Sequence, residues 1–186
     1  MVGLGNPGAR YERTRHNAGF MAVDELAART RAAGRLSSDA WVAEATLAGE
    51  AALLVKPQSY MNLSGAPVAR LLEEHAASSA DLVVVVDDVA LPLGRLRVRE
   101  RGSDGGHNGL RSLVATLGTE EFARVRIGVG LEDAPDMDLA DFVLGEFLAE
   151  ERPRVREVVG LAADAVSCLL QHGAAVAMNR FNGPRV

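Results

Sequence analysis

The sequence predicts an α/β protein: a single globular domain over residues 1–186, with a mixed, mostly parallel, twisted sheet surrounded by helices. Three observations support this fold class. Segments with strand periodicity alternate with segments of helical periodicity along the chain. The run DLVVVVDD at 81–88 is apolar without interruption, which is typical of a central strand buried on both faces. The remaining strand candidates alternate apolar and polar residues, which favours a mixed sheet.

Length and composition favour one soluble domain. A chain of 186 residues, 48% of them hydrophobic, is long enough for one well-buried core and short for two. The single cysteine, Cys168, excludes an internal disulfide and a cysteine-based zinc site. The N-terminus lacks a signal-peptide pattern, and no apolar run approaches the ~20 residues of a membrane span. We therefore expect a soluble protein of the reducing cytoplasm with no membrane attachment.

The predicted elements of the first half follow one another closely. The stretch MVGL at 1–4 predicts the end of a short strand, and the apolar spacing after it predicts a helix with Asn17 near its cap. Two strands at 41–48 and 51–56 come next. Ser64 then stands at the N-cap position of a second helix. The chain therefore starts with an ordinary alternation of strands and helices.

The second half continues this alternation. Strands are predicted at 81–88, 95–101 and 122–130. Between the last two, apolar residues at helical spacing predict a helix, with Asn108 placed to cap it and Gly118 to end it. A long C-terminal helix carries its apolar residues on one side: Val155, Val158, Val159, Ala162, Val166 and Leu169.

Charge is distributed unevenly along the chain. The net charge of -5 argues by itself against a nucleic-acid partner. However, the range 94–126 contains seven arginines and four acidic residues, whereas the range 132–164 contains ten acidic residues and three arginines. One surface can therefore be basic while another repels polyanions.

Four of these arginines alternate along the predicted strand at 95–101: Arg95, Arg97, Arg99 and Arg101. Alternate side chains of a strand share one side, at intervals of about 6.6 Å. The row is suited to following a phosphate backbone. An edge strand protected by charge against aggregation explains the same pattern equally well.

The stretch GLGNPG at 3–8 matches the dinucleotide fingerprint G-x-G-x-x-G after a strand. In that fingerprint the last glycine lies in a helix whose N-terminus holds the pyrophosphate. Here Pro7 and the following ARYERTRH do not continue a helical pattern, and the acids Asp24 and Glu25 come early, at about 16 residues after Gly8 instead of ~20. A dinucleotide-binding enzyme is therefore the less favoured alternative.

Two of the four histidines occur in His-Asn pairs near glycine, in RHNAGF at 15–20 and GGHNGL at 105–110. A histidine acts as a general base when a carboxylate fixes its tautomer and stabilises the imidazolium. Asp87 and Asp88 end the most apolar strand, where α/β proteins place their sites, although a turn or helix cap would explain such a pair as well. No serine or cysteine has the context of an activated nucleophile, so we expect water to be the nucleophile.

Asparagines lie in several of the predicted loops: Asn6, Asn17, Asn62 and Asn108. A neutral amide both donates and accepts, so it can hold a water, a carbonyl oxygen or a developing oxyanion without adding charge. For any single asparagine a turn is the simpler interpretation. Four of them at strand ends favour a site.

Five blocks of this sequence resemble, in order and spacing, the bacterial peptidyl-tRNA hydrolase family: GLGNPGARYERTRHNAGF, KPQSYMNLSG, VVDDVALPLGRLRVRERGSDGGHNGL, RVRIGVG and FVLGEF. Together they span almost the whole chain. The resemblance implies hydrolysis of the ester joining a peptide, or an N-blocked amino acid, to the 3′-terminal ribose of tRNA, which recycles prematurely released peptidyl-tRNA. It also implies a cytoplasmic monomer with no cofactor, no metal and no protein partner.

The resemblance assigns His16 as the general base and Asp87 as its orienting carboxylate. The residues implied to bind peptide, the tRNA 3′ end and the attacking water are Asn6, Tyr11, Tyr60, Met61, Asn62, His107 and Asn108. Phosphates of the acceptor arm are implied to bind Arg97, Arg99 and Arg126. On this interpretation the first His-Asn pair supplies the base, and the second supplies an amide and starts a helix.

Three departures from the family pattern stand out. Ala90 replaces a usual acid after the aspartate pair, the first strand is short, and Lys56 is the only lysine in the chain. A catalytically silent RNA-binding protein of the same fold is the second alternative. Retention of His16 and Asp87 argues against it.

Overall fold

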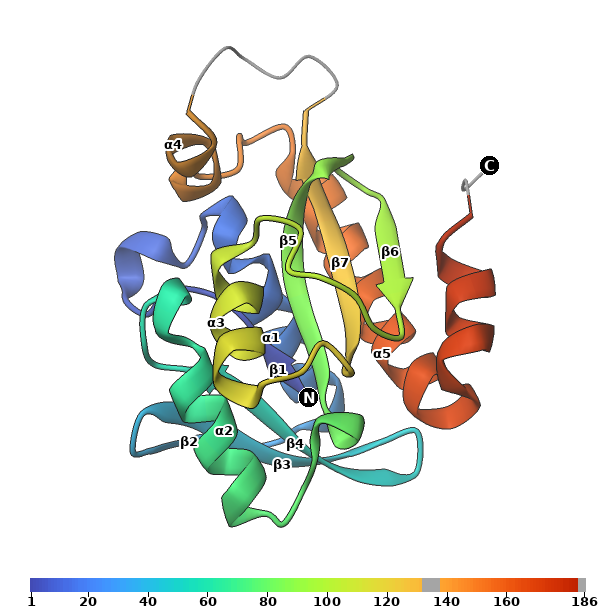
Figure 1. Ribbon diagram of the computed structural model, residues 1–186. Coiled ribbons are helices and arrows are strands. Elements are labelled where there is room, and N and C mark those ends of the chain that lie inside the picture. The colour runs from blue at the N-terminus through green and yellow to red at the C-terminus, as the bar shows by residue number, and fades with distance from the viewer. Residues whose placement is uncertain (132–137, 184–186) are drawn as a thin grey trace.

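A computed structural model describes residues 1–131 and 138–183 (Figure 1). One sheet has seven strands: β1 (Val2–Gly3), β2 (Arg35–Ser37), β3 (Ala40–Leu47), β4 (Glu50–Pro57), β5 (Val83–Pro92), β6 (Leu96–Arg99) and β7 (Ala123–Gly130). The α-helices are α1 (Ala18–Thr30), α2 (Gly65–Glu74), α3 (Asn108–Leu117), α4 (Leu139–Leu144) and α5 (Arg152–Phe181). Short 3₁₀ turns are η1 (Ala9–Tyr11), η2 (Arg15–Asn17), η3 (Met61–Leu63) and η4 (Ser79–Asp81).

The sheet is mixed, as predicted, with the strand order β2-β3-β4-β1-β5-β7-β6. Its centre is parallel, because β1 pairs with β4 and β5, and β5 pairs with β7. The pairings toward both margins are antiparallel, between β2 and β3, β3 and β4, and β6 and β7. The parallel centre directs the carboxyl ends of β1, β5 and β7 to the same edge of the sheet.

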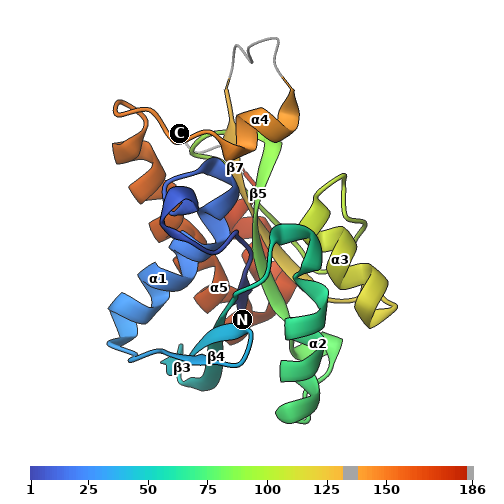
Figure 2. The same ribbon diagram turned by 90° about the vertical axis from the view of Figure 1, so that its left-hand side faces the viewer.

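The apolar run of β5 is buried on both faces, as its composition predicts. Val83 and Val85 belong to the core cluster that includes α1 and α5, and Val84 and Val86 belong to the cluster that includes α2 and α3. None of the four is more than 4% exposed. The two helix pairs accordingly cover opposite faces of the sheet (Figure 2). A strand between two helical layers has no solvent-facing side, which explains the uninterrupted valines.

Helix α5 meets the length and hydropathy criteria of a membrane span, contrary to the expectation that no apolar run approaches that length. It has 30 residues, and an 18-residue window has a mean hydropathy of 1.3. Its buried residues, including Val158 and Val166, pack in the hydrophobic core on the α1 side of the sheet. The helix also breaks at Gly173, where φ is 79°. It is a core helix whose apolar face is used inside the protein.

The N-terminus of α2 differs from the predicted cap. Ser64 stands at the N-cap position, but its hydroxyl donates to the carbonyl of Met61 at 2.8 Å and does not cap the helix. The backbone N–H of Gly65 instead donates to the Oγ of Ser112 on α3, at 2.9 Å. Because a neighbouring helix supplies this acceptor, the cap could not be located from the local sequence.

Strand β6 is an edge strand and is shorter than the predicted 95–101. The side chain of Asn182 pairs with its outer edge, accepting from the N–H of Val98 at 2.6 Å and donating to the carbonyl of Val98 at 3.0 Å. Only Arg97 and Arg99 of the predicted arginine row lie within the strand, and Arg101 forms an ion pair with Glu121 at 3.3 Å. The row therefore has two members, not four.

Candidate active site

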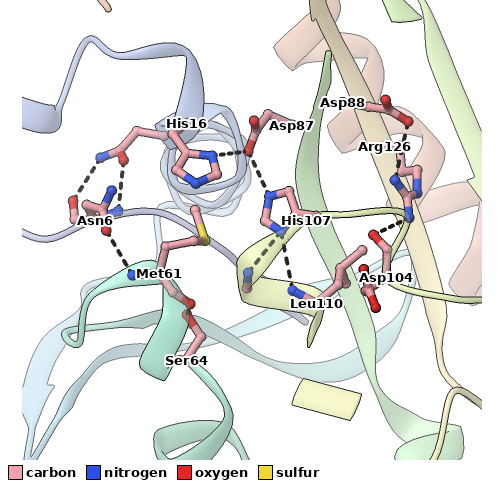
Figure 3. A network of polar contacts seen from close by, with 12 residues as sticks. Asn6, His16, Met61, Ser64, Asp87, Asp88, Asp104, His107, Leu110 and Arg126 are labelled. Atoms are coloured by element: carbon pink, nitrogen blue, oxygen red, sulfur yellow. Dashed lines mark hydrogen bonds and ion pairs between the residues drawn. The ribbon is translucent and has the colours of Figure 1, made fainter. Parts of the chain in front are cut away.

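The two His-Asn segments meet at one carboxylate. Asp87, 2% exposed on β5, accepts from Nδ1 of His16 at 2.8 Å and from Nε2 of His107 at 3.0 Å (Figure 3). Both contacts use the same oxygen, Oδ1. His16 lies in η2 directly before α1, and His107 directly before α3. Since these helices cover opposite faces of the sheet, their N-termini bring the histidines together at Asp87. This residue lies in the middle of β5, which continues to Pro92, and not at the end of the strand as predicted.

The tautomer of His107 follows from its hydrogen bonds. Its Nδ1 accepts from the backbone N–H groups of Gly109 at 3.1 Å and Leu110 at 3.2 Å, so this nitrogen carries no proton. Nε2 therefore carries the proton that is donated to Asp87. His107 is thus the N-cap of α3, and Asn108 is the first helical residue, which corrects the prediction that Asn108 caps this helix. Both nitrogens of His107 are occupied.

His16 has the opposite arrangement. Its Nδ1 donates to Asp87, so Nε2 carries the lone pair. Among the described residues no group hydrogen-bonds this Nε2. Of the two histidines, only His16 presents a nitrogen able to take a proton from a ligand, with its tautomer set by the carboxylate.

Asp87 remains ionised despite its burial. Burial alone would raise the pKa of its carboxyl group, but the electrostatic interaction with His107 and the hydrogen bonds from His107 and His16 outweigh burial and hold this pKa well below its usual range. A carboxylate in this state stabilises positive charge on a neighbouring imidazole.

A pair of asparagines joins the loop after β1 to the start of α1. The backbone N–H of Asn6 donates to Oδ1 of Asn17 at 2.8 Å, and Nδ2 of Asn17 donates to the carbonyl of Asn6 at 3.0 Å. Oδ1 of Asn6 in turn accepts from the backbone N–H of Met61 at 2.8 Å. This contact identifies Oδ1, so the Nδ2 donor of Asn6 has no partner among the described residues. Asn17 therefore holds the loop, and Asn6 keeps a donor for a ligand.

Met61 lies beside the second histidine. A Cβ atom on Gly109 would come within 2.6 Å of the Met61 sulfur and 3.1 Å of Cε1 of His107. Glycine at this position thus leaves room for the Met61 side chain to pack against the start of α3. Asn62 and Asn108, on these same two elements, are both exposed.

The two tyrosines lie further toward solvent. Tyr60 is 53% exposed, and the hydroxyl of the half-buried Tyr11 accepts from Arg10 at 2.5 Å. In the described part of the chain, neither phenol hydrogen-bonds to the histidine pair. The structure thus brings together Asn6, His16, Met61, Asp87 and His107, while the other predicted ligand residues are solvent-accessible.

The arginines of β7 do not form an open basic surface. Arg124 is 1% exposed and donates to backbone carbonyls, including those of Ser103 at 3.1 Å and Glu120 at 2.8 Å. Burial, together with the charge of Arg126, lowers the pKa of Arg124 to about 10. Arg124 thus supports the loop that leads to His107, a role that the sequence analysis missed because alternation along the strand does not tell which face is covered.

Arg126 is held by three partners. Its guanidinium contacts Asp88 at 3.4 Å and the carbonyls of Ser103 at 3.2 Å and Asp104 at 3.1 Å, with 12% of the side chain exposed (Figure 3). Arg97 pairs with it across the β6–β7 ladder. Asp88 therefore serves a structural role beside the catalytic candidate Asp87, because it anchors Arg126 and also accepts from the N–H of Ala90 at 2.9 Å.

Cavity size does not locate this site. The larger cavity, of about 1010 Å³, lies at the opposite end of the sheet and is lined by residues such as Met1, Leu53 and Val83. A smaller cavity of about 260 Å³ borders the Asn6–Asn17 pair. The hydrogen-bond network around Asp87, not the volume of a pocket, identifies the chemistry.

The histidine pair and Asp87 also form a set of metal-ligand types. One nitrogen of each histidine and one oxygen of Asp87 lie within 4.8 Å of one another. Two imidazoles and a carboxylate are ligands that Zn²⁺ takes in catalytic sites. In this structure the same atoms hydrogen-bond directly to each other, so a metal would have to replace both bonds to Asp87. The geometry fits a hydrogen-bonded base better than a metal centre.

The dinucleotide alternative does not agree with the structure. After β1 the chain forms η1 and η2, and the first α-helix starts only at Ala18, ten residues after Gly8. In this described segment the glycine loop is therefore followed directly by a 3₁₀ turn and not by the α-helix whose N-terminus would receive a pyrophosphate.

The fold and the site together define an α/β enzyme that carries a histidine–carboxylate pair on its central strand β5. The family model described as peptidyl-tRNA hydrolase matches residues 1–186. The chain belongs to the peptidyl-tRNA hydrolase family.

Individual relatives match the chain over nearly its full length. The peptidyl-tRNA hydrolase of Chloroflexus aurantiacus is 48% identical over 184 residues, which cover 98% of this chain and 97% of the relative. That of Alkaliphilus oremlandii is 46% identical, with 98% of each chain covered. A crystal structure of the Acinetobacter baumannii enzyme superposes with a TM-score of 0.90 at 31% identity, covering 99% of this chain and 94% of that one.

Proposed function

We propose that this protein hydrolyses the ester between a peptide, or an N-blocked amino acid, and the 3′-terminal ribose of tRNA, with His16 activating a water molecule. In the cell this reaction would recycle tRNA from prematurely released peptidyl-tRNA. The observation that carries the proposal is the free Nε2 of His16, opposite an Nδ1 that donates to Asp87 at 2.8 Å. Membership of the family supplies the substrate class.

The steps of hydrolysis use this arrangement directly. Water gives a proton to Nε2 of His16 while its oxygen attacks the ester carbonyl, and Asp87 stabilises the imidazolium that forms. The tetrahedral oxyanion accepts a hydrogen bond from a neutral donor, for which the unpaired Nδ2 of Asn6 is suited. When the intermediate collapses, the imidazolium returns the proton to the 3′ oxygen of the ribose. The products are the peptide carboxylic acid and the free 3′ hydroxyl of tRNA.

The remaining ligand contacts are assigned by position. The exposed amides of Asn62 and Asn108, on adjacent elements beside His107, are suited to holding the substrate and the attacking water. Tyr11, Tyr60 and Met61 offer apolar surface with polar edges to the peptide and the terminal base. His107 would act mainly through Asp87, because both of its nitrogens are occupied.

Phosphates of the acceptor arm would bind Arg97 and Arg99, which lie on β6 with no carboxylate partner in the described residues. Arg126 lies across the ladder from Arg97, but it would contact a phosphate only through the part of its guanidinium not held by Asp88. The proposal includes no cofactor and no metal, and it places the protein in the cytoplasm as a monomer with no protein partner.

The direct test is release of an N-blocked aminoacyl group from tRNA by the purified protein. A matched control is His75→Ala, because His75 is exposed at the end of α2, away from Asp87. We expect release by the wild type and by this variant. Tight tRNA binding without any release would instead support the catalytically silent RNA-binding alternative.

The arginine contacts can be tested separately from the chemistry. Replacing Arg97 and Arg99 with Gln should raise KM for the tRNA ester and flatten its salt dependence by about one counterion per lost phosphate contact. Hydrolysis of a peptide esterified to a short 3′ fragment should hardly change. Arg70→Gln on α2 is the control for loss of an arginine elsewhere. Equal loss on both substrates would show that the arginines support the fold or the site and not the tRNA.

A further inference from the structure

The residue before the proposed base is a buried arginine that the reaction does not use. Arg15 is 4% exposed and lies with His16 in the single turn η2. Its guanidinium donates to both carboxylate oxygens of Glu151, at 3.0 and 2.7 Å, and to the carbonyl of Val129 at 3.3 Å. The His16 turn is thereby tied to the end of β7 and to the start of α5, two elements far from it in sequence.

Two aromatic rings contact the same guanidinium. Its Cζ lies 4.6 Å from the ring centre of Phe142, on α4, and 4.9 Å from that of Phe147, which follows α4. Stacking on two rings and a bidentate carboxylate together determine the plane of the guanidinium as well as its position.

The backbone on either side is paired with the same segment. The N–H of Arg15 donates to the carbonyl of Gly145 at 3.0 Å, and the N–H of Phe147 donates to the carbonyl of Arg13 at 3.2 Å. Thr14 and Glu146 form an antiparallel bridge between these two hydrogen bonds. Side-chain and backbone contacts therefore act on one short piece of chain, immediately before His16.

A buried ion pair is a poor means of adding stability, because apolar side chains of similar volume often serve as well. A planar guanidinium with a bidentate carboxylate partner instead holds its residue in one defined orientation. Within the described residues, the hydrogen bond to Asp87 is the only one that orients the His16 ring itself. The placement of its backbone has to come from the neighbouring residues, which are Asn17 with its bonds to Asn6 and Arg15 with its bonds to Glu151.

We infer that Arg15 is a positioning residue: through Glu151, Phe142 and Phe147 it sets the backbone position from which His16 reaches the substrate. This inference rests on the proposed function, in which His16 is the base. Arg15 touches no substrate in this account. Its effect is on how often Nε2 of His16 lies within reach of the attacking water, so it acts on turnover and not on tRNA binding.

The test compares Arg15→Lys, Arg15→Met and Glu151→Gln with Arg29→Met. Arg29 lies near the other end of α1 and also bonds to carboxylates, Glu25 at 2.7 Å and Asp164 at 2.6 Å, but its side chain is 40% exposed. We expect kcat to fall roughly 10- to 100-fold in the first three variants, since a displacement of about 1 Å can cost 10²-fold. KM for the tRNA ester should stay within twofold. Arg29→Met should keep the wild-type kcat.

Lysine keeps the positive charge but lacks the planar guanidinium. A low kcat in Arg15→Lys would therefore show that the orientation set by the guanidinium matters and not the charge alone. Glu151→Gln is nearly isosteric and keeps the packing, which guards against simple unfolding. Thermal melting of each variant is measured alongside. If kcat at a temperature where all variants are folded is within twofold of wild type, Arg15 only stabilises the fold and the inference is overturned.

A second measurement does not depend on activity. The proton on Nδ1 of His16, bonded to Asp87, gives a downfield NMR signal that reports the geometry of this bond. We expect it to shift or broaden in the Arg15 and Glu151 variants and to stay unchanged in Arg29→Met. An unchanged signal in Arg15→Met would overturn the inference. Absence of hydrolysis by the wild type, with the signal responding as expected, would instead overturn the proposed function alone.

Discussion

The same dipeptide, His-Asn, occurs in η2 and at the start of α3, and the two copies have different environments. Both histidines donate to Oδ1 of Asp87. His16 uses Nδ1 for this bond and keeps Nε2 free, whereas His107 uses Nε2 because its Nδ1 caps α3. The side chain of a helix cap cannot also be a free base. The position of each histidine relative to its helix therefore decides which one can accept a proton.

The two asparagines differ in the same way. Asn17 is 1% exposed, and its side-chain amide hydrogen-bonds to both the backbone N–H and the backbone carbonyl of Asn6. Asn108 is exposed in the first turn of α3. In the first pair the histidine has a free nitrogen and the asparagine supports the loop. In the second pair the histidine supports the site and the asparagine is left for a ligand.

The largest effect should come from His16→Ala. Loss of a general base typically costs ~10² to 10⁴ in rate, so kcat should fall by this factor while tRNA binding is retained. Single-turnover hydrolysis and a tRNA-binding titration measure the two quantities. If the variant kept near wild-type turnover, His16 would not be the base. The proposed functional difference between the two histidines would then be wrong.

Asp87→Asn should come next, with kcat lower by about 10² because an amide cannot stabilise an imidazolium. The base is still present, so the loss should not exceed that of His16→Ala. Asp88→Asn is the matched control, since Asp88 bonds to Arg126 and to the backbone of Ala90 but not to either histidine. If Asp88→Asn were the slower of the two, the orienting role would belong to Asp88.

The two contacts of His107, with the N-terminus of α3 and with Asp87, can be tested separately. His107→Ala removes both the cap of α3 and the donor to Asp87, and should lower kcat about tenfold together with a loss of about 1 kcal/mol in the free energy of unfolding. His107→Asn keeps a good cap residue but is too short to reach Asp87 in the same way. It should lower kcat to a similar extent with little loss of stability. Equal stability losses in both variants would contradict the assignment of His107 as the cap.

The smallest effect concerns the pH dependence of stability. The pKa of Asp87 is held below its usual range in the folded state, so its contribution to stability is fully present above the unfolded-state pKa of about 3.9. That contribution is lost as the pH falls through the lower, folded-state pKa. Urea unfolding of the wild type and Asp87→Asn should therefore give a difference that is constant near neutral pH and shrinks below about pH 4. A difference that persists undiminished to pH 2.5 would show that the two histidines do not stabilise the carboxylate.

Most strands and helices could be predicted because each depends on apolar periodicity within one segment. The strand β5 and the helix α3 lie within a few residues of their predicted bounds. The short elements β2 and α4 were not predicted. The first is held by pairing with β3, and the second contacts Arg15 through Phe142. β2 has only three residues, which is too short for a clear apolar period, and α4 is held by a partner distant in sequence.

The arginines show the same limit. The sequence predicts a basic segment, but not which of its members reach solvent. Arg124 is buried against backbone carbonyls, Arg126 is bonded to Asp88, and Arg101 is paired with Glu121. Arg97 and Arg99 remain as candidates for phosphate binding. Only the packing of the loop at 102–106 against β7 decides this.

By itself the sequence determined the α/β class and the buried central strand, because residue types and periodicity are local properties. The membership of His16 and Asp87 in one site was implied by the family resemblance. The tertiary structure alone decided that His107 reaches the same carboxylate oxygen, that it and not Asn108 caps α3, and that Arg15 contacts the rings of Phe142 and Phe147. Which nitrogen of a histidine is free depends on every group within hydrogen-bond distance. Here the shared group is the carboxylate of Asp87 on β5, which only folding brings within 3.0 Å of both imidazole rings.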